Sequence, residues 1–130
     1  MKSPIETIRV SQKGKDQLTK LARHTKIQHR NILCRWAFLT SLAESSVPPA
    51  TQIPSDSNLE ISWKVFGGKY AGIYLALLQQ RCKQDGLEMS PDVVATQFRL
   101  HLHRGLGYLA GRQDLRSIQQ LLEPSVSQSF

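Results

Sequence analysis

The fold of this chain is decided by one stretch, residues 7–44, which reads TIRVSQKGKDQLTKLARHTKIQHRNILCRWAFLTSLAE. At its start, polar and apolar side chains alternate, and this period of two predicts a short strand. Ile8 and Val10 would point to one side of the strand, whereas Thr7, Arg9 and Ser11 would point to the other. The stretch therefore begins with a strand that has one buried and one exposed side.

A helix is predicted to follow from about Gln12 to Lys26, because Ser11 is a good N-cap residue. Spacings of three and four residues place Leu18, Leu21, Ala22 and Thr25 in a narrow core stripe. The opposite side of this helix is cationic, with Lys13, Lys20, Arg23 and His24, while Lys15 and Lys26 lie nearer the edge of the stripe. The first helix is thus expected to be buried on one side and basic on the other.

The second helix of the stretch, predicted over 30–44, has apolar residues on almost its whole circumference. A helix of this kind must be buried on nearly all sides. A single small domain has too few other elements to cover its second helix on all sides, so we expect this helix to contact another subunit. Trp36 and Phe38, which belong to this helix, are expected in the core or in that contact.

The order strand, helix, tight joint, apolar helix is typical of a ribbon–helix–helix unit. In such a unit the strands of two chains pair, and the resulting ribbon can enter the DNA major groove. Of the outward strand side chains, Arg9 alone could make a bidentate contact with guanine. A plain edge strand followed by an amphipathic helix in an α-rich domain explains the same pattern, so both interpretations stay open.

Beyond this stretch the chain is expected to be helical and neutral. Helices are predicted over 70–83, 91–110 and 115–122. The predicted fold is mainly α and forms a single domain, with a short N-terminal strand, a ribbon-helix-helix-like helix-turn-helix unit and a C-terminal helical region. Its parts are a basic strand-helix-helix unit over 1–44, a Pro/Ser-rich connection over 45–62, a helical platform over 63–123 and a loose tail over 124–130.

Length and composition are those of one ordinary folded domain, with 130 residues, 40% apolar and 21% charged. No secretory signal is visible, and no apolar run is long enough to span a bilayer, so we expect a cytoplasmic protein without a membrane partner.

Cys34 and Cys82 each lie in an apolar helical pattern. They are expected to be buried as small hydrophobic residues, not to form a disulfide or a metal site.

The basic residues are concentrated at the start of the chain. Among the first 35 residues, Glu6 and Asp16 oppose nine positive charges, which are Lys2, Arg9, Lys13, Lys15, Lys20, Arg23, Lys26, Arg30 and Arg35. This segment therefore carries the whole formal net charge of +7, and residues 36–130 sum to zero. A charge excess at one end indicates an anionic partner there, and a nucleic-acid backbone is the first candidate.

The sequence contains no recognisable catalytic or metal-binding arrangement, so we expect neither an enzyme nor a cofactor. His101 and His103 are two residues apart on a predicted helix, so they face different directions, and one is expected at the surface. Arg35 stands alone among apolar neighbours. It is expected either to pair with a carboxylate, for which Glu44 is one candidate, or to reach a phosphate.

Two further runs are specific, namely Leu33-Cys34-Arg35-Trp36-Ala37-Phe38 and Trp63-Lys64-Val65-Phe66-Gly67-Gly68. With Ile8-Arg9-Val10-Ser11 and Lys15-Asp16-Gln17-Leu18, they resemble the DndE family, the small component of the bacterial DNA phosphorothioation (sulfur modification) system. The similarity covers most of the chain, to about Gly111. Many members of the family carry glycine where Lys26 stands.

The resemblance implies a small homotetramer without catalytic activity. It implies binding to duplex DNA, with a preference for nicked duplex, beside a cysteine desulfurase, a sulfur-transferring enzyme and an ATPase of the same system. The DNA-binding lysines of the family correspond above all to Lys13, Lys15 and Lys20. We therefore predict a DNA-binding surface composed of Lys13, Lys15, Lys20, Arg23, Lys26 and Arg9.

Two other functions stay open. One is a ribbon–helix–helix transcriptional repressor that reads DNA sequence through Arg9. The other is a scaffold whose basic face docks on an acidic patch of a partner protein in the sulfur-transfer machinery.

Overall fold

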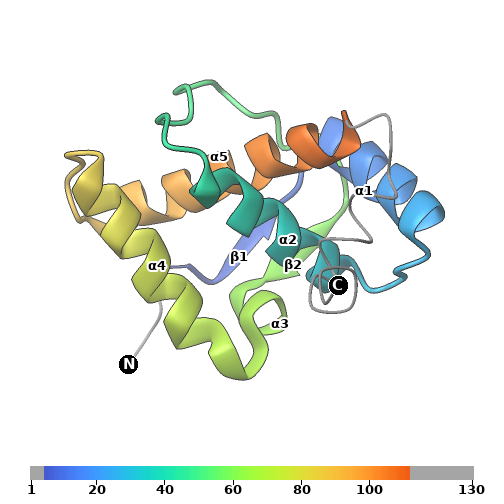
Figure 1. Cartoon of the computed structure of the whole chain (residues 1–130), viewed down its shortest axis with the longest axis horizontal. Helices are drawn as coiled ribbons and strands as arrows, with labels where there is room; N and C mark the ends of the chain where they lie inside the picture. The colour runs from blue at the N-terminus through green and yellow to red at the C-terminus, as the bar shows by residue number, and fades with distance from the viewer. Residues whose placement is uncertain (1–4, 112–130) are drawn as a thin grey trace, which may run out of the picture.

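The computed structural model describes residues 5–111 and shows a helical domain with one small sheet (Figure 1). Its elements are β1 (Thr7–Arg9), α1 (Gln12–Thr25), α2 (Arg30–Ala43), β2 (Glu60–Ser62), α3 (Trp63–Gly67), the short 3₁₀ helix η1 (Gly68–Tyr70), α4 (Ala71–Gln84) and α5 (Pro91–Ala110). The predicted fold class is confirmed. The helix predicted over 115–122 and the tail over 124–130 lie outside the described residues. Within 5–111, no helix is long and apolar enough to cross a membrane.

The partner of the N-terminal strand comes from the same chain. β1 pairs antiparallel with β2, with Ile8 opposite Ile61, and both isoleucines are buried. The ribbon–helix–helix hypothesis expected a strand of a second chain at this place, and it is wrong on that point. The partner strand lies at the end of the Pro/Ser-rich connection, where the sequence predicted extended chain only. Ser11, expected on the exposed side, is buried instead.

Both ends of α1 follow from local chemistry. The Ser11 hydroxyl accepts a hydrogen bond from the Gly14 amide at 2.9 Å, as an N-cap residue does. At the other end, Lys26 takes the left-handed conformation, with φ of 64°. A residue with a side chain in this conformation costs on the order of 1 kcal/mol relative to glycine. The helix therefore ends in a left-handed residue even though that residue is not glycine.

The domain is organised around the contact between α2 and α5, which lie against each other at the centre of the molecule (Figure 1). A Cβ atom built on Gly105 of α5 would lie 1.7 Å from the carbonyl oxygen of Ala37 in α2. The two backbones can approach this closely only because residue 105 has no side chain. α5 also contacts α1 and α4, so it is the central helix against which these three helices pack.

An aromatic cluster fills the core beside this contact. Phe38 of α2 makes edge-to-face contacts with Phe66 and Phe98, at ring centroid distances of 5.6 and 5.3 Å. Trp63 stacks on Phe66 at 5.3 Å. All four rings are buried, which confirms the core placement of Phe38. Trp36, by contrast, is only half-buried in the single chain, because α2 is fully buried along one side and not all round.

The boundary between α4 and α5 follows the local sequence. α4 ends just before Asp85 and Gly86, and α5 begins with Ser90 as N-cap and Pro91 as its first residue, as the sequence predicts.

The outer side of α4 and the turn before it carry a row of exposed apolar side chains, Tyr70, Ile73 and Leu77, which we call the α4 stripe. Their spacing of three and four residues places them on one face.

The close contact at Gly105 predicts a large loss of stability in Gly105→Ala. The added methyl group overlaps the backbone of α2, so the helices must separate, and we expect the free energy of unfolding to fall by about 3 kcal/mol or more. Gly72→Ala in α4 is the matched control, because a Cβ there meets nothing within 4 Å. That variant should gain roughly 0.5–1 kcal/mol. Urea unfolding followed by circular dichroism measures both, and equal stability of the two variants would contradict the packing described.

Candidate nucleic-acid interface

The exposed side of α1 carries a group of cationic side chains that we call the α1 face: Lys13, Lys20 and Arg23. Leu18 and Leu21, on the other side of the helix, are fully buried and hold it against the core. Asp16 is also exposed and lies on the same side as the three cations, where it offsets one positive charge. The sequence thus predicts correctly which side of α1 is buried and which is basic.

Two lysines of α1, one of which belongs to the α1 face, donate hydrogen bonds to other parts of the domain. Lys15 is half-buried, and its Nζ donates to the Asn58 side-chain oxygen at 2.8 Å. Lys20 Nζ donates to the Ala110 carbonyl oxygen at 2.9 Å, which places a positive charge at the C-terminal end of α5. Within residues 5–111, Lys13 Nζ has no hydrogen bond or ion pair with the chain, so it is the lysine of α1 most available to a ligand.

Arg9 belongs to β1, not to the α1 face, and is already paired. Its guanidinium group forms an ion pair with Glu60 of β2 and donates to the Ser57 carbonyl oxygen at 2.7 Å. To read guanine, Arg9 would first have to give up the carboxylate. The arrangement uses Arg9 to hold β1 to the second strand, which removes the basis of the repressor hypothesis.

Four other arginines hold backbone carbonyl groups. Arg35 donates to the Phe66 and Val65 carbonyl oxygens, so the predicted pairing with Glu44 is wrong, and its target is the end of α3. Arg99 donates to the carbonyl oxygens of Arg9, Ile53 and Pro54. Arg81 and Arg104 hold carbonyl oxygens at the end of α2 and just after it. These arginines therefore fix the fold, and most of the ligand-accessible charge is carried by lysines.

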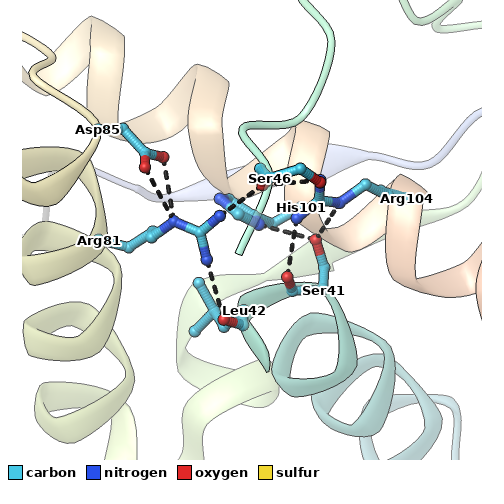
Figure 2. Close-up of polar contacts among 7 residues, drawn as sticks. All are labelled: Ser41, Leu42, Ser46, Arg81, Asp85, His101 and Arg104. Carbon is cyan, nitrogen blue, oxygen red and sulfur yellow. Dashed lines mark hydrogen bonds and ion pairs between the residues drawn. The ribbon is translucent and has the colours of Figure 1, made fainter. Parts of the chain in front are cut away.

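A serine and a histidine lie together in the core, which raises the question of catalysis (Figure 2). Ser41 Oγ is 2.8 Å from His101 Nδ1, and Arg104 Nε donates to the same oxygen at 2.8 Å. Both Ser41 and His101 are completely buried, so no substrate reaches the hydroxyl group. The cluster joins the end of α2 to α5, and Arg81 extends it to α4 through Asp85 and the Leu42 carbonyl oxygen. Its role is structural.

The histidines of α5 do not form a metal site. His101 is buried, and His103 is half-buried with its Nε2 accepting from the Ser11 amide and its Nδ1 facing the Arg99 carbonyl oxygen. The prediction that they face different directions holds, and His103 is the one that is partly exposed. Within the described part of the chain, no three ligating side chains come together. Cys34 and Cys82 are buried and free, as predicted, and burial raises the pKa of the Cys34 thiol to about 12.

A pocket opens beside the α1 face, and the sequence did not predict it. It has a volume of about 460 Å³ and lies between α1, α5 and the segment before β2. Lys13 and Gln17 of α1 line it together with Arg104 and Tyr108 of α5. The one local signal was the spacing of four between Arg104 and Tyr108, which places both on one side of a helix. Their proximity to Lys13 depends on the packing of α1 on α5.

Comparison with known proteins gives one family and one fold. The family model described as DNA sulphur modification protein DndE matches residues 7–117. The crystal structure of DndE from Escherichia coli B7A, a protein involved in DNA phosphorothioation modification, is similar to this chain with a TM-score of 0.66 and 22% sequence identity. The similarity covers 80% of this chain and 95% of that one. No curated protein sequence matches the chain.

The buried cluster predicts that the protein becomes less stable as the pH is lowered. Burial and the positive charges of Arg81 and Arg104, only partly opposed by Asp85, lower the pKa of His101 from 6.5 to about 4. Below pH 6.5 the unfolded chain takes up a proton that the folded chain refuses until about pH 4, so the free energy of unfolding should fall between these values, by up to about 3 kcal/mol.

The measurement is urea unfolding at pH 7, 6 and 5. His101→Gln cannot take up this proton, so its stability should fall less steeply over the same range. Parallel pH profiles of the two proteins would show that His101 is not the group responsible.

Proposed function

This chain belongs to the DndE family of DNA sulphur modification proteins, and from that membership we propose that it is a non-catalytic, DNA-binding accessory subunit of the phosphorothioation system. We propose that it binds duplex DNA through the α1 face and prefers nicked duplex. It would work in the cytoplasm beside the other components of the system. Membership supports a role in DNA phosphorothioation, whereas the binding mode is our inference from the charges described above.

The observation that carries the proposal is the unequal use of the two kinds of basic side chain. Arg35, Arg81, Arg99 and Arg104 donate to groups of the chain itself, and Arg9 is paired with Glu60. The α1 face, by contrast, presents Lys13 and Arg23 to solvent, and Lys20 is exposed although its Nζ donates to the Ala110 carbonyl oxygen. A row of exposed cations on one helix suits the phosphates of a duplex, which carry a negative charge at regular short intervals.

Lysine chemistry also fits a substrate that is defined by its backbone. A nick is a broken phosphodiester chain, so its recognisable features are phosphates and ease of bending. Lysine is a point charge on a flexible stem and binds phosphate without the fixed fork geometry that base reading by arginine requires. Lys13, Lys20 and Arg23 would make the principal contacts, with Lys15 and Lys26 at the edges of the surface.

We propose in addition that the protein is a homotetramer, which would repeat the α1 face and widen the positive surface. The α4 stripe supports this proposal, since Tyr70, Ile73 and Leu77 are 50%, 58% and 43% exposed in the single chain. On α2, the apolar residues Ile32, Trp36 and Leu39 are only half-buried. Apolar side chains grouped in this way are usual at contacts between subunits.

The binding proposal predicts that the double variant Lys13→Glu, Lys20→Glu loses DNA binding. Four units of charge change on the face, so repulsion replaces attraction, and we expect affinity for nicked duplex to fall at least a hundredfold in fluorescence anisotropy. With about four phosphates neutralised, the slope of log K against log[salt] should be near −3 to −4 for the wild-type protein.

The matched control is Lys64→Glu, Lys69→Glu, which makes the same charge change at exposed lysines outside the α1 face. This control should keep most of the affinity, and circular dichroism should show that both double variants are folded. Equal losses in the two would mean that net charge, not the α1 face, determines binding. A strong preference of the wild-type protein for one operator-like sequence would overturn the accessory role.

The tetramer proposal predicts that Ile73→Asp, Leu77→Asp reduces the size of the assembly. Two carboxylates in an apolar contact would be buried without partners, which disfavours association. Light scattering after size exclusion measures the mass. Met89→Asp is the control, because Met89 is similarly exposed at 47% but lies outside the α4 stripe. If the double variant keeps the wild-type mass, the α4 stripe is not a subunit contact.

A further inference from the structure

The pocket beside the α1 face combines the features of a nucleotide site. Its volume of about 460 Å³ lies in the range of sites for small ligands. Tyr108, 41% exposed, lines it with Ile53, Leu100 and the prolines before β2, so its walls are mostly apolar. The Arg104 guanidinium lies over the Tyr108 ring, 5.7 Å from its centroid, and holds that ring at the pocket wall.

The charges around the pocket favour an anionic occupant. Lys13 belongs to both the α1 face and the pocket lining, so a phosphate bound at the face lies at the pocket mouth. Arg104 contributes a second positive charge. The carboxylate of the lining, Asp56, already accepts a hydrogen bond from the Gln12 amide at 2.7 Å. His103 adds no charge, because burial lowers its pKa and its Nε2 accepts from the Ser11 amide.

We infer that this pocket receives the unstacked terminal nucleotide at a nick, with its base against Tyr108 and its phosphate near Lys13. This inference rests on the proposed function, in which the α1 face holds a nicked duplex. At a nick the covalent link between the terminal nucleotide and its stacked neighbour is broken, so the terminal base leaves the helix at a lower cost than a base inside an intact strand. Every base has a flat face that can stack on an aromatic ring, so such a site needs no sequence preference.

The pocket therefore accounts for a preference that charge alone does not give. Phosphates of an intact duplex and of a nicked duplex attract the α1 face almost equally, because nicking changes the backbone charge only at its ends. Intact duplex would bind the α1 face only and leave the pocket empty, whereas nicked duplex would bind both the α1 face and the pocket. The pocket would thus determine the ratio of the affinities for nicked and intact duplex, and the α1 face would determine the affinity that both duplexes share.

Gly107 allows the pocket to be closed without disturbing the fold. It lines the pocket, and a Cβ atom at this position would meet nothing closer than Gln17 Nε2 at 3.9 Å. Gly107→Leu therefore places a side chain in the pocket while improving the helix propensity of α5. We expect this variant to be at least as stable as the wild-type protein.

The experiment compares affinities for nicked and intact duplexes of one sequence by fluorescence anisotropy. In addition, the base of the terminal nucleotide on each side of the nick is removed in turn. For the wild-type protein, we expect the preference for nicked over intact duplex to fall about tenfold when the base on one side is absent. Gly107→Leu and Tyr108→Ala should show the same fall with the complete nick and no further fall with the abasic one. Tyr108→Phe, which keeps the ring, should behave as the wild type.

The outcomes separate the two proposals. If wild-type protein prefers nicked duplex and Gly107→Leu keeps that preference, the pocket inference is overturned and the proposed function stands. An acidic segment of a partner protein would then be the occupant to consider. If the wild-type protein binds nicked and intact duplex equally, the proposed nick preference itself is contradicted, and the pocket inference falls with it.

Discussion

The close approach of α2 to α5 at Gly105 is the constraint on which the rest of the structure depends. Because a methyl group at that position would overlap the Ala37 carbonyl oxygen, the two helices can lie this close only with glycine at residue 105. Phe38 and Phe98 come from these two helices, and their contact fixes the aromatic core at that separation. α5 in turn supports α1, so the direction of the α1 face is a consequence of helix packing and not of the basic residues themselves.

The two basic residue types have different physical roles in this molecule. Arginine offers five donors in a planar group, so one side chain can hold several carbonyl oxygens where the chain has no regular secondary structure. Arg99 does this for the segment before β2, and Arg104 does it for the chain after α2. Lysine, with a flexible stem and a single charge, remains at the solvent side of α1. The basic residues behind the net charge of +7 are therefore divided between structural and accessible groups, and the accessible ones are fewer than the total suggests.

Features determined by neighbouring residues could be predicted from the sequence. Ser11 and Ser90 begin helices because each hydroxyl reaches an amide three residues further on. Features determined by distant residues could not. β2 depends on pairing with β1 across more than fifty residues, and Arg35 finds the carbonyl groups of α3 instead of a carboxylate. For the candidate site, the basic side of α1 was predictable from helical periodicity. The pocket was not, because it needs Lys13 and Tyr108 to meet in space.

Lysine acetylation with and without a saturating nicked duplex, read by mass spectrometry, tests the central claim most directly. Every exposed lysine reports on its own surroundings in the same sample, so the protein supplies its own controls. The account predicts that the duplex protects Lys13 and Lys20 on the α1 face, while Lys64, Lys69 and Lys83, all exposed on other elements, keep their reactivity. Protection of the second group with unchanged reactivity at Lys13 and Lys20 would contradict it.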